Sequence, residues 1–187
     1  IKNMESFLQR SELAKIIKES GVKVEKYLEE EIVKNSDPVS ISRFLEIIPN
    51  VSDSPDQLYE MLITHEHKKI QEDALENLLK LDKQKAVAIC DNVLQKATEE
   101  KILVPIILAL KKLNSVEATL AVEALIQILR NSESFKVKRA CCGALGSIGD
   151  NRALPILAQL ANEKKIMSSK EEEELKIFAT QALKYFR

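Results

Sequence analysis

Residues 137–160 read VKRACCGALGSIGDNRALPILAQL, and this stretch decides how the rest of the chain is interpreted. Apolar residues recur every three or four positions on both sides of Gly149-Asp150, which is the periodicity of amphipathic helices. A glycine is the usual residue in the left-handed turn that ends a helix, and an aspartate often caps the start of the next. The stretch therefore predicts two helices joined by a tight turn.

The same stretch holds two adjacent cysteines and three of the four glycines in the chain, so phosphate and metal sites have to be weighed. A phosphate loop places its glycines between a strand and a helix, whereas Gly143 and Gly146 lie within a helical pattern. Adjacent helical residues point about 100° apart, and a structural zinc site needs four ligands. We therefore expect close helix packing at both glycines, a core position for Cys141, and neither a cofactor nor a metal.

The helical pattern recurs along the chain with a period of roughly 35 residues, which is typical of repeat proteins. Aligning the repeats places Ala109-Leu110 on Ala144-Leu145, and it places Leu78 of the preceding repeat on Leu110. In the last repeat, Ala182-Leu183 falls on Ala144-Leu145. A single helix pair cannot bury its apolar stripe alone, so such repeats stack into one continuous core.

One repeat carries a resemblance to a known family. Its matching residues are Val137, Arg139, Ala140, Ala144, Leu145, Gly146, Ile148, Gly149, Asp150, Ala153 and Leu157. This unit resembles a HEAT repeat of the short type found in phycobilisome lyases, and residues 83–131 resemble it less closely. The resemblance implies an all-α fold, a right-handed α-solenoid (an α-α superhelix) of HEAT-like helix pairs. It also implies that Arg139 joins a ladder between repeats.

We expect residues 1–187 to form a single HEAT-like repeat domain, in which residues 1–21 form an N-terminal capping helix. Helix pairs are predicted at 22–49, 55–81, 83–113, 115–148 and 151–187. Their inner helices are predicted at 39–49, 67–81, 99–113, 136–148 and 171–186. Helix-boundary signals lie at Gly21, Asp37-Pro38, Ser54-Pro55 and Ser169 with Glu172.

Composition narrows the class of protein. The formal net charge of −1 disfavours a nucleic-acid binder, although it leaves room for a local basic patch. Three cysteines, an odd number, do not make a disulfide framework, so we expect a reducing compartment and a cytoplasmic location. The longest uncharged apolar run spans only positions 102–110, whereas a membrane span needs about 20 residues. The sequence begins with Ile, and we expect it to be part of a larger parent protein.

The resemblance also raises three kinds of chemistry. Some HEAT-type hydroxylases bind two iron ions through several His-Glu pairs, but His65 and His67, on either side of Glu66, are the only histidines here. HEAT-like DNA glycosylases hold bases with aromatic side chains, and this chain has no Trp. Bilin lyases share the repeat type. We therefore expect no catalytic residue and no enzyme, with a lyase-type enzyme and a nucleic-acid-binding HEAT domain as the alternatives.

The helix expected at 99–113 is apolar on all sides, unlike the inner helices before and after it. Such a helix is either covered by other segments or carries an exposed patch that binds a partner. The repeat alignment assigns Ile102, Ile106 and Leu110 to the core. It assigns the following residues to a concave groove: Glu72, Leu75, Glu76, Leu103, Val104, Ile107, Leu108, Lys138, Arg139 and Cys142.

The charges of this predicted groove change sign along the chain, with acidic residues before the apolar helix and basic residues after it. A bound segment would therefore have a preferred direction. We expect a non-catalytic protein-protein interaction scaffold that binds a partner helix or peptide in this groove.

Overall fold

The structure is a computed structural model that describes residues 7–20, 24–34, 37–52, 55–113, 116–162 and 169–186. In these ranges every regular element is a helix, with eleven α-helices and three short 3-10 helices and no strand. The α-helices are α1 (Phe7–Ser20), α2 (Glu25–Lys34), α3 (Pro38–Val51), α4 (Pro55–Ile63), α5 (Lys68–Leu81), α6 (Lys83–Lys96), α7 (Glu100–Leu113), α8 (Val122–Asn131), α9 (Phe135–Ile148), α10 (Leu154–Asn162) and α11 (Lys170–Leu183). The prediction of an all-α fold is confirmed.

The chain contains two compact units, and the single repeat domain expected over residues 1–187 stays a prediction. Unit 1 comprises Ile1–Leu81 and unit 2 comprises Asp82–Arg187. The boundary falls between the predicted helix pairs 55–81 and 83–113. Continuity of the repeats from one unit into the other stays a prediction.

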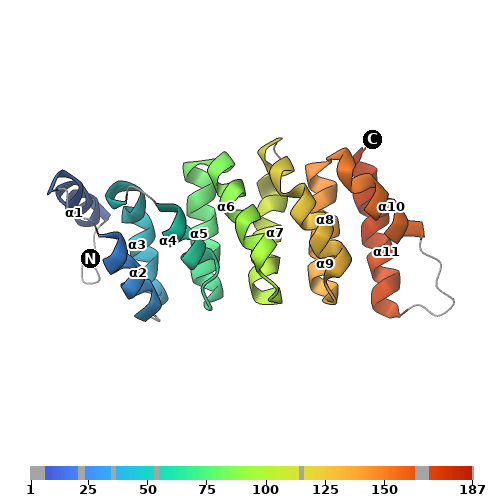
Figure 1. Cartoon of the computed structure of the whole chain (residues 1–187), viewed down its shortest axis with the longest axis horizontal. Helices are drawn as coiled ribbons and strands as arrows, with labels where there is room; N and C mark the ends of the chain where they lie inside the picture. Colours follow the sequence, from blue (N-terminus) through green and yellow to red (C-terminus); the bar gives the residue numbers. More distant parts are fainter. Residues whose placement is uncertain are drawn as a thin grey trace. The chain divides into compact units, whose positions relative to one another are not determined.

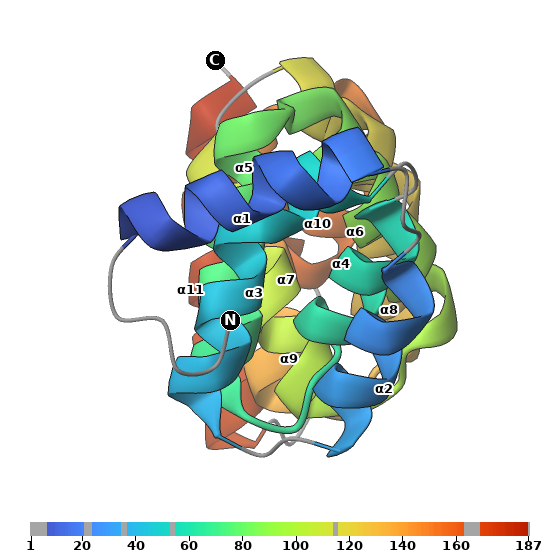
Figure 2. The same ribbon diagram turned by 90° about the vertical axis from the view of Figure 1, so that its left-hand side faces the viewer.

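Unit 1 contains α1 to α5. Helix α3 packs against α1 on one side and α5 on the other, and α4 pairs with α5. Figure 2 shows α1 running across α3 rather than along it. The core of this unit is made of large apolar side chains such as Phe44, Tyr59 and Ile70, which are almost completely buried.

Unit 2 is built around α9, which packs against both α7 and α11 (Figure 1). Helices α6 and α8 lie on the other side of this unit from α7 and α9 (Figure 2). Two 3-10 turns, η1 (Val116–Ala121) and η2 (Asn151–Ala153), lead into α8 and α10, and η3 (Lys184–Phe186) follows α11. The pairs predicted at 83–113, 115–148 and 151–187 therefore correspond to helices that contact each other.

The helix boundaries follow from local chemistry. The Asp37 carboxylate accepts hydrogen bonds from the backbone N–H groups of Val39 and Ser40 at the start of α3. Ser169 and Glu172 form the predicted capping box at the start of α11, with side chain and backbone bonded in both directions. The predicted signals at Gly21 and Ser54 lie outside the described residues.

The turn predicted at Gly149 is confirmed. This glycine ends α9 in the left-handed region, with φ 70°, and its N–H donates to the Leu145 carbonyl. The Asp150 carboxylate then accepts from the Arg152 N–H and starts the next helix pair. Close packing is also confirmed at Gly146, where a Cβ atom would lie 2.8 Å from the Ala182 Cα. Only a residue without a side chain lets α9 approach α11 this closely.

Candidate functional site

The structure divides the predicted groove residues between the two units. Glu72, Leu75 and Glu76 lie in unit 1, and the other seven lie in unit 2. The exposed members are Glu72, Glu76, Leu108 and Arg139, and the half-buried ones are Val104 and Lys138. The buried members are Leu75, Leu103, Ile107 and Cys142. Placing these last four on a groove surface is wrong.

The cause of this error is visible in the packing of unit 2. Helix α9 contacts both α7 and α11, so each of these three helices is covered by a neighbour as well as by the layer behind it. Ile107 and Cys142 hold the same position in successive repeats, and both are fully buried. A helix flanked in this way exposes a narrower stripe than a helix that packs on one side only. The sequence interpretation made the exposed stripe too wide.

The corrected surface has one exposed stripe on each of three neighbouring helices. We call it the α7–α9–α11 face. Its exposed residues are Leu108, Lys111, Arg139, Ile177 and Gln181, and its half-buried residues are Val104 and Gly143. The repeat alignment places Leu108, Gly143 and Gln181 at equivalent positions. A hydrogen bond from the Ser147 hydroxyl to the Lys111 carbonyl, 3.0 Å long, fits this register between α7 and α9.

Arg139 is the most distinctive side chain of this face. Its guanidinium carbon lies 5.6 Å from the ring centroid of Phe178 on α11 and 5.9 Å from that of Phe135 on its own helix. The side chain thus links α9 to α11 through its contact with Phe178 rather than through an ion pair. A guanidinium held against rings keeps its N–H donors in a fixed plane, where they can still bind a carboxylate.

Lys111 extends from α7 across the neighbouring helix. Its Nζ atom would lie 3.2 Å from a Cβ atom at Gly143, so the glycine leaves the space that this side chain fills. No ion pair joins Lys111, Lys112 or Arg139 to a carboxylate among the described residues. Near the start of the same helices the charges are matched, because Lys136 pairs with Glu100 at 3.1 Å and Lys101 with Glu99 at 3.0 Å.

Lys138 does not belong to this face. It is the neighbour of Arg139 on a helix, so its side chain points about 100° away, and it is half-buried. Phe135, Ile177 and Phe178 were not predicted as site residues. The alignment that matches Ala182-Leu183 to Ala144-Leu145 also places Ile177 at the position equivalent to Arg139. The repeat pattern could therefore have identified Ile177 as a site residue.

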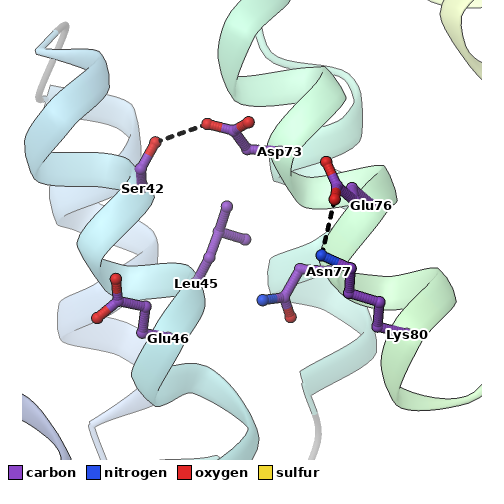
Figure 3. Close-up of a pocket in the computed structure, with 7 residues that line it drawn as sticks. All are labelled: Ser42, Leu45, Glu46, Asp73, Glu76, Asn77 and Lys80. Atoms are coloured by element: carbon purple, nitrogen blue, oxygen red, sulfur yellow. Dashed lines mark hydrogen bonds and ion pairs between the residues drawn. The ribbon is translucent and has the colours of Figure 1, made fainter. Parts of the chain in front are cut away.

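Unit 1 has a different feature, an open cleft of about 250 Å³ between α3 and α5 (Figure 3). Its lining residues are Ser42, Leu45, Glu46, Asp73, Glu76, Asn77 and Lys80. Of these, only Glu76 was predicted to lie at a site. The spacing of Glu76 and Lys80, one helical turn apart on α5, was the available signal for an ion pair there.

Charged groups in and beside this cleft are matched within the chain. Asp73 accepts from the Ser42 hydroxyl at 3.1 Å and pairs with Lys69 at 2.7 Å. Lys80 pairs with Glu76 at 2.7 Å (Figure 3), and its ammonium group holds the Glu76 pKa below the ordinary value. At the other end, the Glu46 carboxylate lies 2.6 Å from both Nε and Nη2 of the guanidinium of Arg10.

The remaining candidates for chemistry are buried or paired. Burial raises the pKa of the Cys90 and Cys142 thiols to about 12 and raises that of Cys141 further, so all three stay protonated at neutral pH. His65 and His67 stack with ring centroids 5.5 Å apart, and burial lowers the pKa of His65. In the part of the chain that the structure describes, no three His, Cys, Asp or Glu side chains are grouped to hold a metal ion.

A family model for HEAT repeats matches residues 106–184, from α7 to the first residue of η3. This part of unit 2 contains the turn at Gly149, the Gly146 contact and most of the α7–α9–α11 face. Residues 106–184 are therefore similar to HEAT repeats. Searches of curated proteins and of solved structures found no match.

HEAT repeats generally serve as scaffolds for protein interaction. The match is to HEAT repeats as a class, and the short type found in phycobilisome lyases stays a prediction. Among the described helices, none combines the length and the apolar character that crossing a membrane requires.

Proposed function

We propose that the chain is a non-catalytic, intracellular protein-interaction module. In this proposal the helix pairs of each unit stack as a right-handed solenoid. The α7–α9–α11 face of unit 2 binds a segment of a partner protein. The family match over residues 106–184 supports this class of function.

The observation that carries the proposal is a pair of large apolar side chains left in water on this face. Leu108 and Ile177 are 42% and 56% exposed, although the other apolar residues of their helices are buried or half-buried. They lie on the two helices that pack against α9, which carries the stacked Arg139. Exposed apolar surface marks partner-binding sites, and arginine is among the residues enriched where partners bind most strongly.

The enzyme alternative has little support from the described side chains. A lyase that forms a covalent bond to its substrate through cysteine needs a reactive thiolate, and burial disfavours that form at all three cysteines. The cleft between α3 and α5 offers carboxylates, but each is held by a cation or hydroxyl of the chain. We therefore propose binding rather than catalysis.

Site-specific photocrosslinking tests the proposal. A benzophenone amino acid would replace Leu108 in one protein and Leu120 in a matched control, because Leu120 is 53% exposed on η1, which packs against α6. Both proteins would be expressed in cells of the source organism and irradiated there. We expect one defined protein to be captured at Leu108 at least tenfold more efficiently, identified by mass spectrometry, and to bind the purified chain.

The control decides how the result is interpreted. Equal capture at both positions would indicate random collision with an exposed probe. Failure to capture anything at Leu108, with the variant shown to be folded, would contradict the proposed binding face.

A further inference from the structure

Resting on the proposed function, we infer that the α7–α9–α11 face recognises an acidic segment of the partner protein. Such a segment presents two carboxylates, one to Arg139 and one to Lys111, and places an apolar side chain against Leu108 or Ile177. Three properties of unit 2 support this inference: its charge, the spacing of the two cations, and the apolar surface beside them.

The net charge of the chain conceals an asymmetry between the units. Residues 1–81 contain 11 Lys and Arg against 16 Asp and Glu, a formal charge of −5. Residues 82–187 contain 17 Lys and Arg against 13 Asp and Glu, a formal charge of +4. Unit 2 therefore attracts acidic partners, although the net charge of the whole chain is only −1.

Two cations that pair with no carboxylate of the described residues lie on the α7–α9–α11 face. Arg139 is exposed and stacked on two rings, and Lys111 crosses α9 at Gly143. By contrast, Lys101, Lys136 and Arg152 in the same unit each form an ion pair. Charged side chains that a protein leaves unmatched beside exposed apolar residues are available for a partner of opposite charge.

The spacing sets the pattern of the bound segment. Arg139 and Gly143 are one helical turn apart on α9, about 6 Å along the helix axis. Carboxylates at positions i and i+2 of an extended segment are about 6.6 Å apart, and those at i and i+4 of a helix are about 6 Å apart. The bound segment thus carries its two acidic residues at positions i and i+4 if it is helical, or at positions i and i+2 if it is extended.

The apolar surface favours a protein over a nucleic acid. A phosphate backbone would meet the exposed side chains of Leu108 and Ile177 beside the two cations. The start of α11, next to this face, carries Glu171, Glu172, Glu173 and Glu174 in sequence, which repel phosphates. A polypeptide that presents only two carboxylates, both to the cations, and places an apolar side chain against Leu108 or Ile177 avoids the first penalty and meets the second only in part.

Peptide selection tests the inference. A phage library of random dodecapeptides would be selected on the purified full chain, and the enriched peptides would be synthesised with a fluorescent label. We expect enrichment of Asp and Glu next to Leu, Ile or Phe. We also expect Arg139→Gln and Lys111→Gln each to weaken binding about tenfold in fluorescence anisotropy. Replacing Glu by Gln in the peptide should have the same effect on the wild-type chain.

Two controls protect this test. Lys80→Gln removes a lysine that Glu76 already pairs in unit 1, and it should leave peptide affinity unchanged. If Arg139→Gln misfolds, Lys111→Gln still tests the inference. Lys111 lies on the surface, and its ammonium group is not stacked on the two phenylalanine rings. Circular dichroism of each variant verifies the fold.

The remaining outcomes separate the inference from the proposed function. Two results would contradict an acidic partner segment without contradicting the binding face. The enriched peptides could lack carboxylates, or they could bind both variants with the same affinity as the wild-type chain. Tighter binding of a single-stranded oligonucleotide through Arg139 and Lys111 would assign the face to nucleic acid. If the chain self-associates in a salt-sensitive way and Arg139→Gln abolishes this self-association, the face would be assigned to binding a second copy of the chain. If no peptide is enriched, the inference is overturned. If no crosslink forms at Leu108 either, the proposed function is overturned as well.

Discussion

Two helical surfaces of the molecule differ in how their charged side chains are paired. One is formed by α3 and α5 in unit 1, and the other by α7, α9 and α11 in unit 2. In unit 1 the carboxylates Glu46, Asp73 and Glu76 are each held by a cation of the chain. In unit 2 the cations Lys111 and Arg139 have no carboxylate partner among the described residues. The charged groups on the surface of one helix pair can therefore be matched by internal ion pairs, while those on another are left unpaired.

This difference indicates where to look for function in a repeat protein. A charged cleft such as that between α3 and α5 draws attention first, because it is visibly hollow (Figure 3). Yet its charges are already matched, so a ligand would have to displace existing pairs. The α7–α9–α11 face of unit 2 offers groups that lose no ion pair when a partner arrives.

The largest expected effect comes from two adjacent residues of α7. Ile107 is fully buried and Leu108 is 42% exposed. Ile107→Glu places an unpaired carboxylate in the core and should destabilise unit 2 by about 4 kcal/mol, whereas Leu108→Glu should cost less than about 0.5 kcal/mol. All three cysteines lie in unit 2 and are buried, so the rate of thiol labelling in mild urea reports on this unit alone. Similar labelling rates for the two variants would contradict the corrected face.

A second comparison uses two glycines of α9. A Cβ atom at Gly146 would collide with the Ala182 backbone, whereas one at Gly143 would meet only the flexible end of Lys111. We expect Gly146→Val to destabilise unit 2 by about 2 kcal/mol through overpacking against α11. Gly143→Ala should be nearly neutral in the same thiol-labelling measurement. Equal costs would show that α9 and α11 are not in close contact.

A third change should stabilise unit 1. Gln71 is 2% exposed, and its Nε2 atom has no hydrogen-bond partner among the described residues. The repeat alignment places Leu103 of α7 at the equivalent position. Gln71→Leu removes an unsatisfied buried amide and should stabilise unit 1 by about 1 kcal/mol, seen as slower hydrogen exchange across residues 68–81. Faster exchange would mean that the amide has a partner after all.

The smallest effect concerns the exposed pair of Glu76 and Lys80. Lys80 lowers the pKa of Glu76 from its ordinary value of 4.5, so the stability that this pair adds is present above that pH. It is lost as the pH falls through the lowered value in the folded state. Lys80→Gln should leave thermal stability at pH 7 unchanged within experimental error, because exposed pairs contribute little. Below pH 4.5, the thermal stability of this variant should decrease slightly less steeply with pH than that of the wild type. A large loss at pH 7 would show that the cleft depends on this pair.

Much of the fold could be predicted from local sequence signals. The turn at Gly149, the caps at Asp37 and Ser169, and the helix periods each depend on residues close in sequence, and each is confirmed. The division into two units could not be predicted in this way. It depends on which helices contact each other, and the repeat pattern looks continuous across residues 81 and 82.

The candidate site was predicted only in part, for a related reason. Periodicity correctly placed Glu72, Glu76, Leu108 and Arg139 on an exposed stripe. It cannot tell whether a residue at the edge of that stripe meets water or the next helix, which is why Ile107 and Cys142 were misplaced. The stacking of Arg139 on Phe178 joins residues far apart in the sequence, and only the packing of α9 on α11 reveals it.

The most direct test of the central claim is hydrogen–deuterium exchange of the full chain with and without its bound segment, either the crosslinked partner or a selected peptide. The account predicts slower exchange in the segments that cover α7, α9 and α11, with no change in those that cover α3 and α5. It further predicts that Arg139→Gln abolishes this protection. Protection confined to residues 38–51 and 68–81 would contradict the account and assign recognition to the cleft of unit 1.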